Sequence, residues 1–344
     1  MKSNHRNILF TFDYELFLGA RSGTVEKCLI EPTNLLIDLF DKYSIKSTIF
    51  FVDTTYLIRL EQEQSEACKK DLEAIKKQLR TLIQNGHYVF PHIHPHWMDA
   101  KYDSTINEWS LNDYSKYRFH HTSEKDRGVL FGESIRLLEE IIKPINSNYK
   151  INGYRAGGWS LQPFEDFLPY FKKYNISNEF SVVPGFKNLS EAQYFDFTDC
   201  PKKDIYNFDI NPVIEQDNGS FREFTISTLE ITSALKLKSK VWGKYLWKTG
   251  QRSIGKGSGL VIKDESVTNK KSDFLGSKNK EMISVELLTK VKLPYYKRFI
   301  DNSAYMHFIS HPKMLSYHNI KTLESFLKHV SNRFVLSTDF AQLK

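Results

Sequence analysis

Four of the chain's eleven histidines lie within ten residues, and the last three of these alternate along the chain. The run reads Gly86-His87-Tyr88-Val89-Phe90-Pro91-His92-Ile93-His94-Pro95-His96-Trp97. Alternate residues of an extended segment point to the same side, and residues four apart share one face of a helix. Either conformation brings two or three imidazoles together, and neutral imidazole is the commonest protein ligand for zinc and similar ions. The run therefore predicts a metal site.

A pair of carboxylates follows the first apolar run of the chain. Asp13 and Glu15 are two residues apart in the sequence Thr-Phe-Asp-Tyr-Glu, so on an extended backbone both face the same side. Two carboxylates side by side repel each other unless a cation lies between them. One of them can ligate a metal while the other stays free as a general base. Together with two histidines this gives three protein ligands and an open position for water, which is the layout of a catalytic metal site.

Strands and helices alternate along most of the chain. Apolar and β-branched runs predict strands at 7–13, 47–52, 88–90, 152–155, 304–310 and 333–337. Helical spacing predicts helices at 32–43, 62–85, 132–142, 164–174 and 320–329, and Gly86 fits the position after the second helix. After about residue 207 the pattern changes to short strands at 208–210 and 220–227. Strand–helix alternation of this kind predicts a parallel sheet or an α/β barrel.

Each polar cluster lies at the end of a predicted strand. Asp13 and Glu15 end the first strand, the histidine run follows the third, and Arg155 and His311 come at the ends of two later ones. In parallel α/β folds, the carboxyl ends of the strands meet at one edge, and the chemistry gathers there. We therefore expect these side chains to share one site.

The overall composition is that of an ordinary soluble globular protein, with 344 residues of which 40% are hydrophobic and 26% charged. The apolar run near the N-terminus is too short for a signal-peptide core, and no later run reaches the length of a membrane span. These features predict a cytoplasmic location. Cys28, Cys68 and Cys200 are odd in number, widely spaced and without a C-x-x-C pair, which argues against a disulfide framework and a cysteine zinc site.

The net charge of +7 is concentrated in one segment. Residues 231–300 contain 16 Lys and Arg against 5 Asp and Glu, a local balance of +11, so the rest of the chain is close to −4. We expect a single domain over residues 1–344 with a basic, loop-rich insertion at about 231–300. This insertion is either a solvated surface or a contact for something anionic, such as a membrane face, a lipid diphosphate carrier or an acidic polysaccharide. Nucleic acid is not expected as a partner, because no recognisable reading motif is present.

Five short motifs resemble, in their order and spacing, those of the polysaccharide deacetylases of carbohydrate esterase family 4. The motifs are Thr11-Phe12-Asp13-x-Glu15, Ser47-Thr48-Ile49-Phe50-Phe51-Val52, Gly86-His87 leading into His92-x-x-x-His96, Gly153-Tyr154-Arg155-Ala156-Gly157-Gly158-Trp159, and Phe308-Ile309-Ser310-His311-Pro312. The resemblance covers about residues 7–340 and is more specific in the first three motifs than in the last two. It implies an irregular (β/α)7-type barrel.

The resemblance also implies catalytic roles. Asp13 would be the general base that deprotonates a metal-bound water, and Arg155 would pair with Asp13 and keep it ionised. His311, protonated, would donate to the leaving amine. The metal would polarise the acetamide carbonyl and help to stabilise the oxyanion. The reaction implied is hydrolysis of an N-acetyl group to a free amine and acetate.

The metal ligands implied by the resemblance are Glu15, His92 and His96, which would hold zinc or a similar divalent ion. The family motif has adjacent aspartates, the second of which is the ligand, whereas Tyr14 occupies that place in this chain. We assign the ligand to Glu15 because strand geometry puts it on the same side as the general base. The proline after His94 disfavours helical geometry there, so the segment can be extended and His94 can replace His96 as ligand. Alternatively, His94 supports the ligands or contacts the substrate.

The leading expectation is a metal-dependent deacetylase that acts on an N-acetylated sugar. The expected cytoplasmic location points to a nucleotide- or lipid-linked precursor used in surface polysaccharide biosynthesis. Two alternatives stay open. One is another amide hydrolase on the same barrel, acting on a small cyclic or linear amide. The other is a barrel that binds carbohydrate without turnover, for which the tyrosine at position 14 is the best argument.

Overall fold

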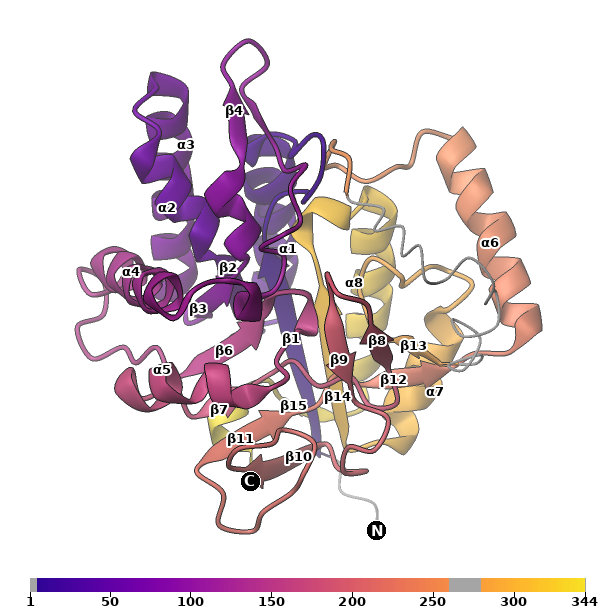
Figure 1. Ribbon diagram of the computed structural model, residues 1–344. Helices are drawn as coiled ribbons and strands as arrows, with labels where there is room; N and C mark the ends of the chain where they lie inside the picture. The colour runs from indigo at the N-terminus through magenta and orange to yellow at the C-terminus, as the bar shows by residue number, and fades with distance from the viewer. Residues whose placement is uncertain (1–4, 260–279, 344) are drawn as a thin grey trace.

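One large, curled sheet forms the centre of the computed structural model, which describes residues 5–259 and 280–343 (Figure 1). Within the described residues this sheet has nine strands, and β15 (Val335–Ser337) pairs with the start of β1. The other eight follow the order β10 (Ile205–Phe208), β11 (Phe221–Phe224), β7 (Asn178–Glu179), β6 (Gly153–Ala156), β3 (Tyr88–Ile93), β2 (Ile49–Asp53), β1 (His5–Tyr14) and β14 (Tyr305–Ser310). All neighbouring strands are parallel except β10 and β11.

Helices flank the sheet on both sides. Figure 1 shows α2, α3 and α4 on one flank and α7 and α8 on the other. The helices are α1 (Glu31–Lys42), α2 (Thr54–Gln62), α3 (Glu66–Gln84), α4 (Glu124–Ile142), α5 (Leu168–Lys173), α6 (Ser233–Lys248), α7 (Leu293–Asn302) and α8 (Tyr317–Ser331). Gly86, two residues after α3, has a φ of +82°, a backbone conformation that glycine adopts without steric cost, as its predicted place after the helix requires. None of the described helices is long and apolar enough to cross a membrane.

The two ends of the curled sheet are joined by the residues that follow β11. The Ile226 amide donates to the Val182 carbonyl at 2.9 Å, and the next amide, that of Ser227, donates to the His307 carbonyl in β14 at 3.2 Å. The segment thus links the neighbourhood of β7 to the free edge of β14. This arrangement confirms the predicted α/β class and the barrel-like course of the sheet.

Strand β1 shows how alternation separates the core from the interior of the curl. Phe10 and Phe12 point outward and pack on Phe40 of α1, with ring centroids 5.1 and 6.1 Å away. Thr11, which lies between the two phenylalanines, and Asp13, which follows them, are buried on the opposite face. Because successive side chains of a strand point to opposite faces, the apolar outer face of β1 fixes which polar residues face inward.

The basic segment at 231–300 contains more regular structure than expected. Its described part includes α6, α7 and β13 (Lys280–Met282), whereas residues 260–279 lie outside the described residues. β13 pairs with β12 (Thr228–Glu230), and two further hairpins are β4 (Lys101–Asp103) with β5 (Glu108–Ser110) and β8 (Lys187–Leu189) with β9 (Tyr194–Asp196). Ile283, Val285 and Ile300 join the same hydrophobic cluster as Ile8 of β1. The single-domain organisation stays a proposal, which this shared core supports.

Candidate active site

The ends of β1 and β3 bring three candidate ligands to one point. Nε2 of His94 lies 2.7 Å from Oε2 of Glu15 and 3.0 Å from Nε2 of His92, and the remaining distance, from His92 to Glu15, is 3.5 Å. All three side chains are buried. Atoms bound to one tetrahedral zinc at about 2.05 Å would be roughly 3.3 Å apart, which is within the range of these distances. The three residues are also a group whose ligand atoms all lie within 4.8 Å of one another.

The hydrogen bonds around His92 fit a metal ligand. Its Nδ1 lies 2.8 Å from the carbonyl oxygen of Arg155 on the neighbouring strand β6. Because a carbonyl can only accept, Nδ1 carries a proton. When the ring is neutral, as a metal ligand must be, Nε2 has a lone pair that faces Glu15 and His94. Histidine ligands in metal sites are oriented in the same way, by a hydrogen bond from the ring nitrogen that does not bind the metal. Three electron-pair donors that converge in a buried place favour a cation between them.

Gly157 leaves room for His94. A Cβ on Gly157 would lie 2.4 Å from the Ile93 carbonyl oxygen and 2.9 Å from Nδ1 of His94, distances that real side chains do not show. The glycine that follows β6 therefore allows the chain to pass close to the histidine run. A larger residue at this position would displace the imidazole of His94.

His96 lies outside this group, although the resemblance implied it as a ligand. The backbone at His94 is extended, with φ −116° and ψ 90°, and a short 3-10 turn begins at Pro95. This turn directs His96 to Tyr117, on which it stacks with ring centroids 5.0 Å apart. Neither ring nitrogen of His96 has a hydrogen-bond partner among the described residues. The geometry therefore favours His94 over His96 as the second histidine ligand, for the reason that the proline suggested.

Tyr14 points away from the three converging ligands. Its hydroxyl donates to Oε1 of Gln78 in α3 at 2.7 Å, and its ring belongs to the main hydrophobic cluster. Asp13 and Glu15, on either side of it, face the interior instead. A carboxylate at position 14 would therefore face the helices, and position 15 is the one that β1 presents to the histidines.

Asp13 is paired as the resemblance implied. Nη1 of Arg155 lies 2.5 Å from Oδ1 of Asp13, and both side chains are buried. Burial by itself raises the pKa of Asp13, but the charges of Arg155, His92 and His311 outweigh it and hold the pKa below its ordinary value. Nη2 of Arg155 also donates to Oγ1 of Thr11 at 2.8 Å. Asp13 is therefore ionised at neutral pH, as a general base must be.

His307 supports the same arginine from β14. Its Nε2 lies 3.1 Å from Oγ1 of Thr11 and 3.3 Å from Nη2 of Arg155. Burial and the positive charge of Arg155 lower its pKa to about 3, so the ring is neutral. His307 is thus a packed, uncharged neighbour of the site.

His311 faces the carboxylates from the end of β14. Its Nε2 lies 3.6 Å from Oδ2 of Asp13 and 3.7 Å from Oε1 of Glu15. The side chain is 27% exposed, whereas Asp13 and Glu15 are almost fully enclosed. Burial lowers the pKa of His311, but the hydrogen bond and charge of Glu286, together with both carboxylates, raise it above its ordinary value. A histidine that holds its proton is suited to act as a general acid.

Glu286 is a site residue that was not predicted from the sequence. Oε1 of Glu286 accepts from Nδ1 of His311 at 2.9 Å, and Oε2 accepts from the backbone amide of His311 at 3.2 Å. Val285 beside it donates from its amide to Oγ of Ser310, and this places the segment along β14. Glu286 lies in the lysine-rich segment without any motif around it, so no local signal could have marked it.

Lys313 is a second residue that the sequence analysis missed. Its Nζ donates to Oε1 of Glu15 at 2.8 Å and to the carbonyl of Leu16 at 2.6 Å, in a buried position. The other oxygen of Glu15, Oε2, faces His92 and His94. Lys313 follows the motif histidine by two residues, and that spacing is the signal that could have pointed to it.

Asp53 is the last residue of β2, next to His92 in the sheet. It also hydrogen-bonds Trp97 in the turn that follows His94. One carboxylate oxygen accepts from the amide of Tyr56 at the start of α2, and the other accepts from Nε1 of Trp97 at 2.5 Å. Burial and the nearby charge of Glu15 raise the pKa of Asp53 to about 8. Asp53 is therefore largely protonated at neutral pH and ties α2 to the turn after His94.

Comparisons with known proteins give distant structural likenesses. No protein-family model matches the chain, and no curated protein matches its sequence. Among solved structures, the catalytic domain of a peptidoglycan N-acetylglucosamine deacetylase from Eubacterium rectale is 14% identical with a TM-score of 0.34, over 97% of this chain and 88% of that one. A GH57-type branching enzyme from Pyrococcus horikoshii is 10% identical with a TM-score of 0.46, over 99% and 69%.

A 4-alpha-glucanotransferase from Thermococcus litoralis is 12% identical with a TM-score of 0.45, over 98% of this chain. The chain spans only 38% of that enzyme's length. None of these TM-scores reaches 0.5, so the fold and the site are assigned from this chain's own residues.

Proposed function

We propose that this protein is a metal-dependent deacetylase that hydrolyses the N-acetyl group of an N-acetylated sugar. The observation that carries the proposal is the convergence of Glu15, His92 and His94 on one point, with Asp13 and His311 beside it. Structural sites close the coordination of zinc with four protein ligands, whereas catalytic sites keep three and leave one position open. The donor set of two imidazoles and one carboxylate belongs to the second kind.

The residues around this point divide the work of amide hydrolysis. A divalent ion, when bound, would acidify water and polarise the acetamide carbonyl. Asp13, held ionised by Arg155, takes the proton from the attacking water. His311, oriented by Glu286, gives its proton to the amine nitrogen as the carbon–nitrogen bond breaks. The products are acetate and a free amine.

Each charged group of the site has a partner of opposite charge on its outer side. Arg155 neutralises Asp13, Lys313 neutralises Glu15, and Glu286 neutralises protonated His311. These pairings fix the side chains and leave one atom of each turned toward the other groups of the site. Fixed groups of this kind lower the reorganisation that the reaction requires.

The alternative of a barrel that binds without turnover loses its main argument. It was based on Tyr14, which packs against Gln78 on the outer face of β1 and takes no part in the site. The second alternative, a hydrolase for a small amide, shares the same residues and differs in the substrate. We therefore keep the sugar amide as the proposal, with a nucleotide- or lipid-linked precursor of a surface polysaccharide in the cytoplasm as the proposed setting.

The direct test is acetate release by purified protein loaded with zinc or cobalt. Candidate substrates are a nucleotide-linked N-acetylhexosamine, an N-acetylated oligosaccharide and a simple N-acetylated amino compound without a sugar. The proposal predicts acetate release from at least one of the sugar substrates, and loss of this activity after chelation with recovery on adding the ion back. Release from the simple amide alone would favour the small-amide hydrolase. Stoichiometric metal with no acetate from any substrate would contradict hydrolysis.

A further inference from the structure

Helix α6 presents two adjacent stripes of side chains to solvent. Leu237, Val241 and Tyr245 are spaced four residues apart and form an apolar stripe, with exposed fractions of 65, 61 and 53%. The lysines at 240, 244 and 248 have the same spacing and are also exposed. Residues four apart in a helix lie one above the other, so the two sets run side by side along the helix.

The contacts of α6 with the rest of the protein use a different face. Leu235 joins the main hydrophobic cluster, and Leu246 is buried. Nε1 of Trp242 donates to Nε2 of His318 in α8 at 3.4 Å. These three positions lie opposite Leu237 on the helix, so their contacts leave both stripes exposed. Figure 1 shows α6 at the right-hand edge of the molecule, away from α3 and α4.

The outer face of α6 carries positive charge without acidic neighbours on the helix. Residues 231–248 contain five lysines and no aspartate or glutamate. None of the ion pairs between described residues involves Lys240, Lys244 or Lys248. At the end of the helix, Trp247 is 60% exposed, and the Arg252 guanidinium lies 4.1 Å from its ring centroid. Apolar, aromatic and basic side chains thus occur together on one exposed surface.

We propose that α6 binds the surface of an anionic lipid bilayer. Helices that lie in a membrane interface combine lysines with large apolar and aromatic residues, and the lysines are attracted to anionic headgroups. The apolar stripe would enter the boundary between headgroups and acyl chains, where tyrosine and tryptophan are favoured. A second copy of this chain is a poorer partner, because two α6 helices face to face would oppose lysines to lysines.

Vesicle co-sedimentation of the full-length protein tests this inference. The probes are vesicles of phosphatidylcholine alone and of phosphatidylcholine mixed with phosphatidylglycerol. We expect binding to the anionic vesicles that weakens with added salt and is absent from the neutral ones. The variant Lys240→Gln/Lys244→Gln/Lys248→Gln should bind about 100-fold more weakly, since each lysine near an anionic surface contributes roughly fivefold. Leu237→Ser/Val241→Ser should bind at least about tenfold more weakly, because it removes the apolar part of the interaction.

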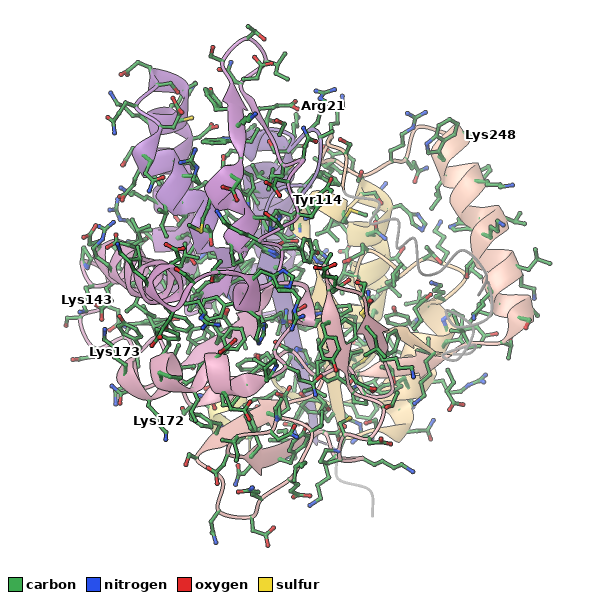
Figure 2. The ribbon with its side chains drawn as sticks, viewed as in Figure 1. Arg21, Tyr114, Lys143, Lys172, Lys173 and Lys248 are labelled. Atoms are coloured by element: carbon green, nitrogen blue, oxygen red, sulfur yellow. The ribbon has the colours of Figure 1, made fainter. Side chains whose placement is uncertain are left out.

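A matched control has three exposed lysines elsewhere changed in the same way. In Figure 2, Lys143, Lys172 and Lys173 lie on the side of the molecule opposite to Lys248. The variant Lys143→Gln/Lys172→Gln/Lys173→Gln loses the same net charge and should keep its vesicle binding. Thermal melting curves of all variants show whether the fold is retained, and since all the altered side chains are exposed, we expect no large change.

Three outcomes would overturn the inference. The first is equal binding to neutral and anionic vesicles, or to neither. The second is an equal loss of binding in the control variant, which would mean that net charge alone is responsible. The third is a concentration-dependent dimer that the Leu237→Ser/Val241→Ser variant abolishes, which would assign the apolar stripe to a second copy. None of these readouts uses catalysis, so this inference and the proposed deacetylation can fail separately.

Discussion

The two sides of the candidate site are built in different ways. On one side, Asp13, Glu15, His92 and His94 come from the ends of two strands, β1 and β3, and each pair is two residues apart. On the other side, His311 comes from the end of β14 and Lys313 from the turn after it. Glu286 comes from an irregular segment that runs along the edge of β14. The first side is set by the alternation of a strand. The second side depends on tertiary contacts.

The first side can be predicted from sequence spacing, whereas the second side requires knowledge of tertiary contacts. Alternation tells which residues share a face, so the first side can be recognised from spacing alone. On the second side, Lys313 supplies the charge opposite to Glu15, and Glu286 orients the proton donor His311. Of these two partners, only Lys313 has a spacing signal, its position two residues after His311. Changes on the first side should therefore abolish metal binding or catalysis, and changes on the second side should lower stability or activity without abolishing either.

The largest effect is expected for Asp13→Asn, which removes the proposed base from the first side. Removing a positioned general base lowers the turnover number by about 10³-fold. The matched control is Asp53→Asn at the end of the neighbouring strand. Because the pKa of Asp53 is about 8, its carboxyl group is largely protonated at neutral pH and is unsuited to act as the base. Asparagine keeps only one of the two hydrogen bonds that Asp53 accepts, so Asp53→Asn should lose some stability but far less activity than Asp13→Asn. Zinc content should stay unchanged in both variants, and full activity in Asp13→Asn would contradict the assignment.

Lys313→Met tests whether the second side stabilises the first. Removing one partner of a buried ion pair leaves an uncompensated charge and costs about 3 kcal/mol of stability. The free energy of unfolding of the metal-free variant should fall by that amount in urea titrations. Zinc should then stabilise the variant more than it stabilises the wild-type protein, because the ion replaces the missing positive charge beside Glu15. A variant as stable as the wild type without metal would show that the pair with Glu15 is unimportant.

A comparison of His94→Asn with His96→Asn tests which of the two histidines binds the metal on the first side. His94 lies in the converging group and His96 does not, although both are buried and belong to the same alternating run. Since altering even the partners of a ligand weakens metal affinity by 10–100-fold, removing a ligand should cost at least about 100-fold. Zinc affinity, measured by competition with a chromogenic chelator, should fall in His94→Asn and stay within about threefold in His96→Asn. The reverse result would restore the ligand set that the family resemblance implied.

Glu286→Gln should have the smallest of these effects. Burial lowers the pKa of His311 and Glu286 raises it, so without the carboxylate the pKa of His311 falls. The protonated form is then lost at lower pH, and the alkaline limb of the kcat/KM profile should move toward lower pH, with about a tenfold lower value at neutral pH. Glu281→Gln is the matched control, because Glu281 pairs with Lys292 in the same segment and does not contact His311. Identical pH profiles for the wild type and Glu286→Gln would remove Glu286 from the site.

The sequence predicted those parts of the fold that depend on local patterns. The strands β1, β2, β3, β6 and β14 and the helices α1, α3 and α8 lie near their predicted ranges, because their apolar residues have clear periodicity. Helix α2 was not predicted; it begins at Thr54, directly after the end of β2 at Asp53. Helix α6 lies in the segment predicted as a loop-rich insertion, because its five lysines interrupt the apolar pattern.

The site residues, too, could be predicted only where a local pattern marks them. Asp13, Glu15 and Arg155 were found from motifs, and the choice between His94 and His96 depended on the backbone conformation before a proline. Glu286 and Lys313 act across 25 and 298 residues of sequence separation, on His311 and Glu15 respectively. Contacts of that range follow from how β14 lies beside β1, and a single sequence contains no direct record of them.

The most direct test of the proposed metal site is a crystal structure of the zinc-loaded protein with anomalous data collected at the zinc absorption edge. We expect one strong anomalous peak bounded by Oε2 of Glu15 and by Nε2 of His92 and of His94, with Asp13 beside the open coordination position. Zinc bound by His96 in place of His94, or zinc bound only elsewhere on the molecule, would contradict this expectation.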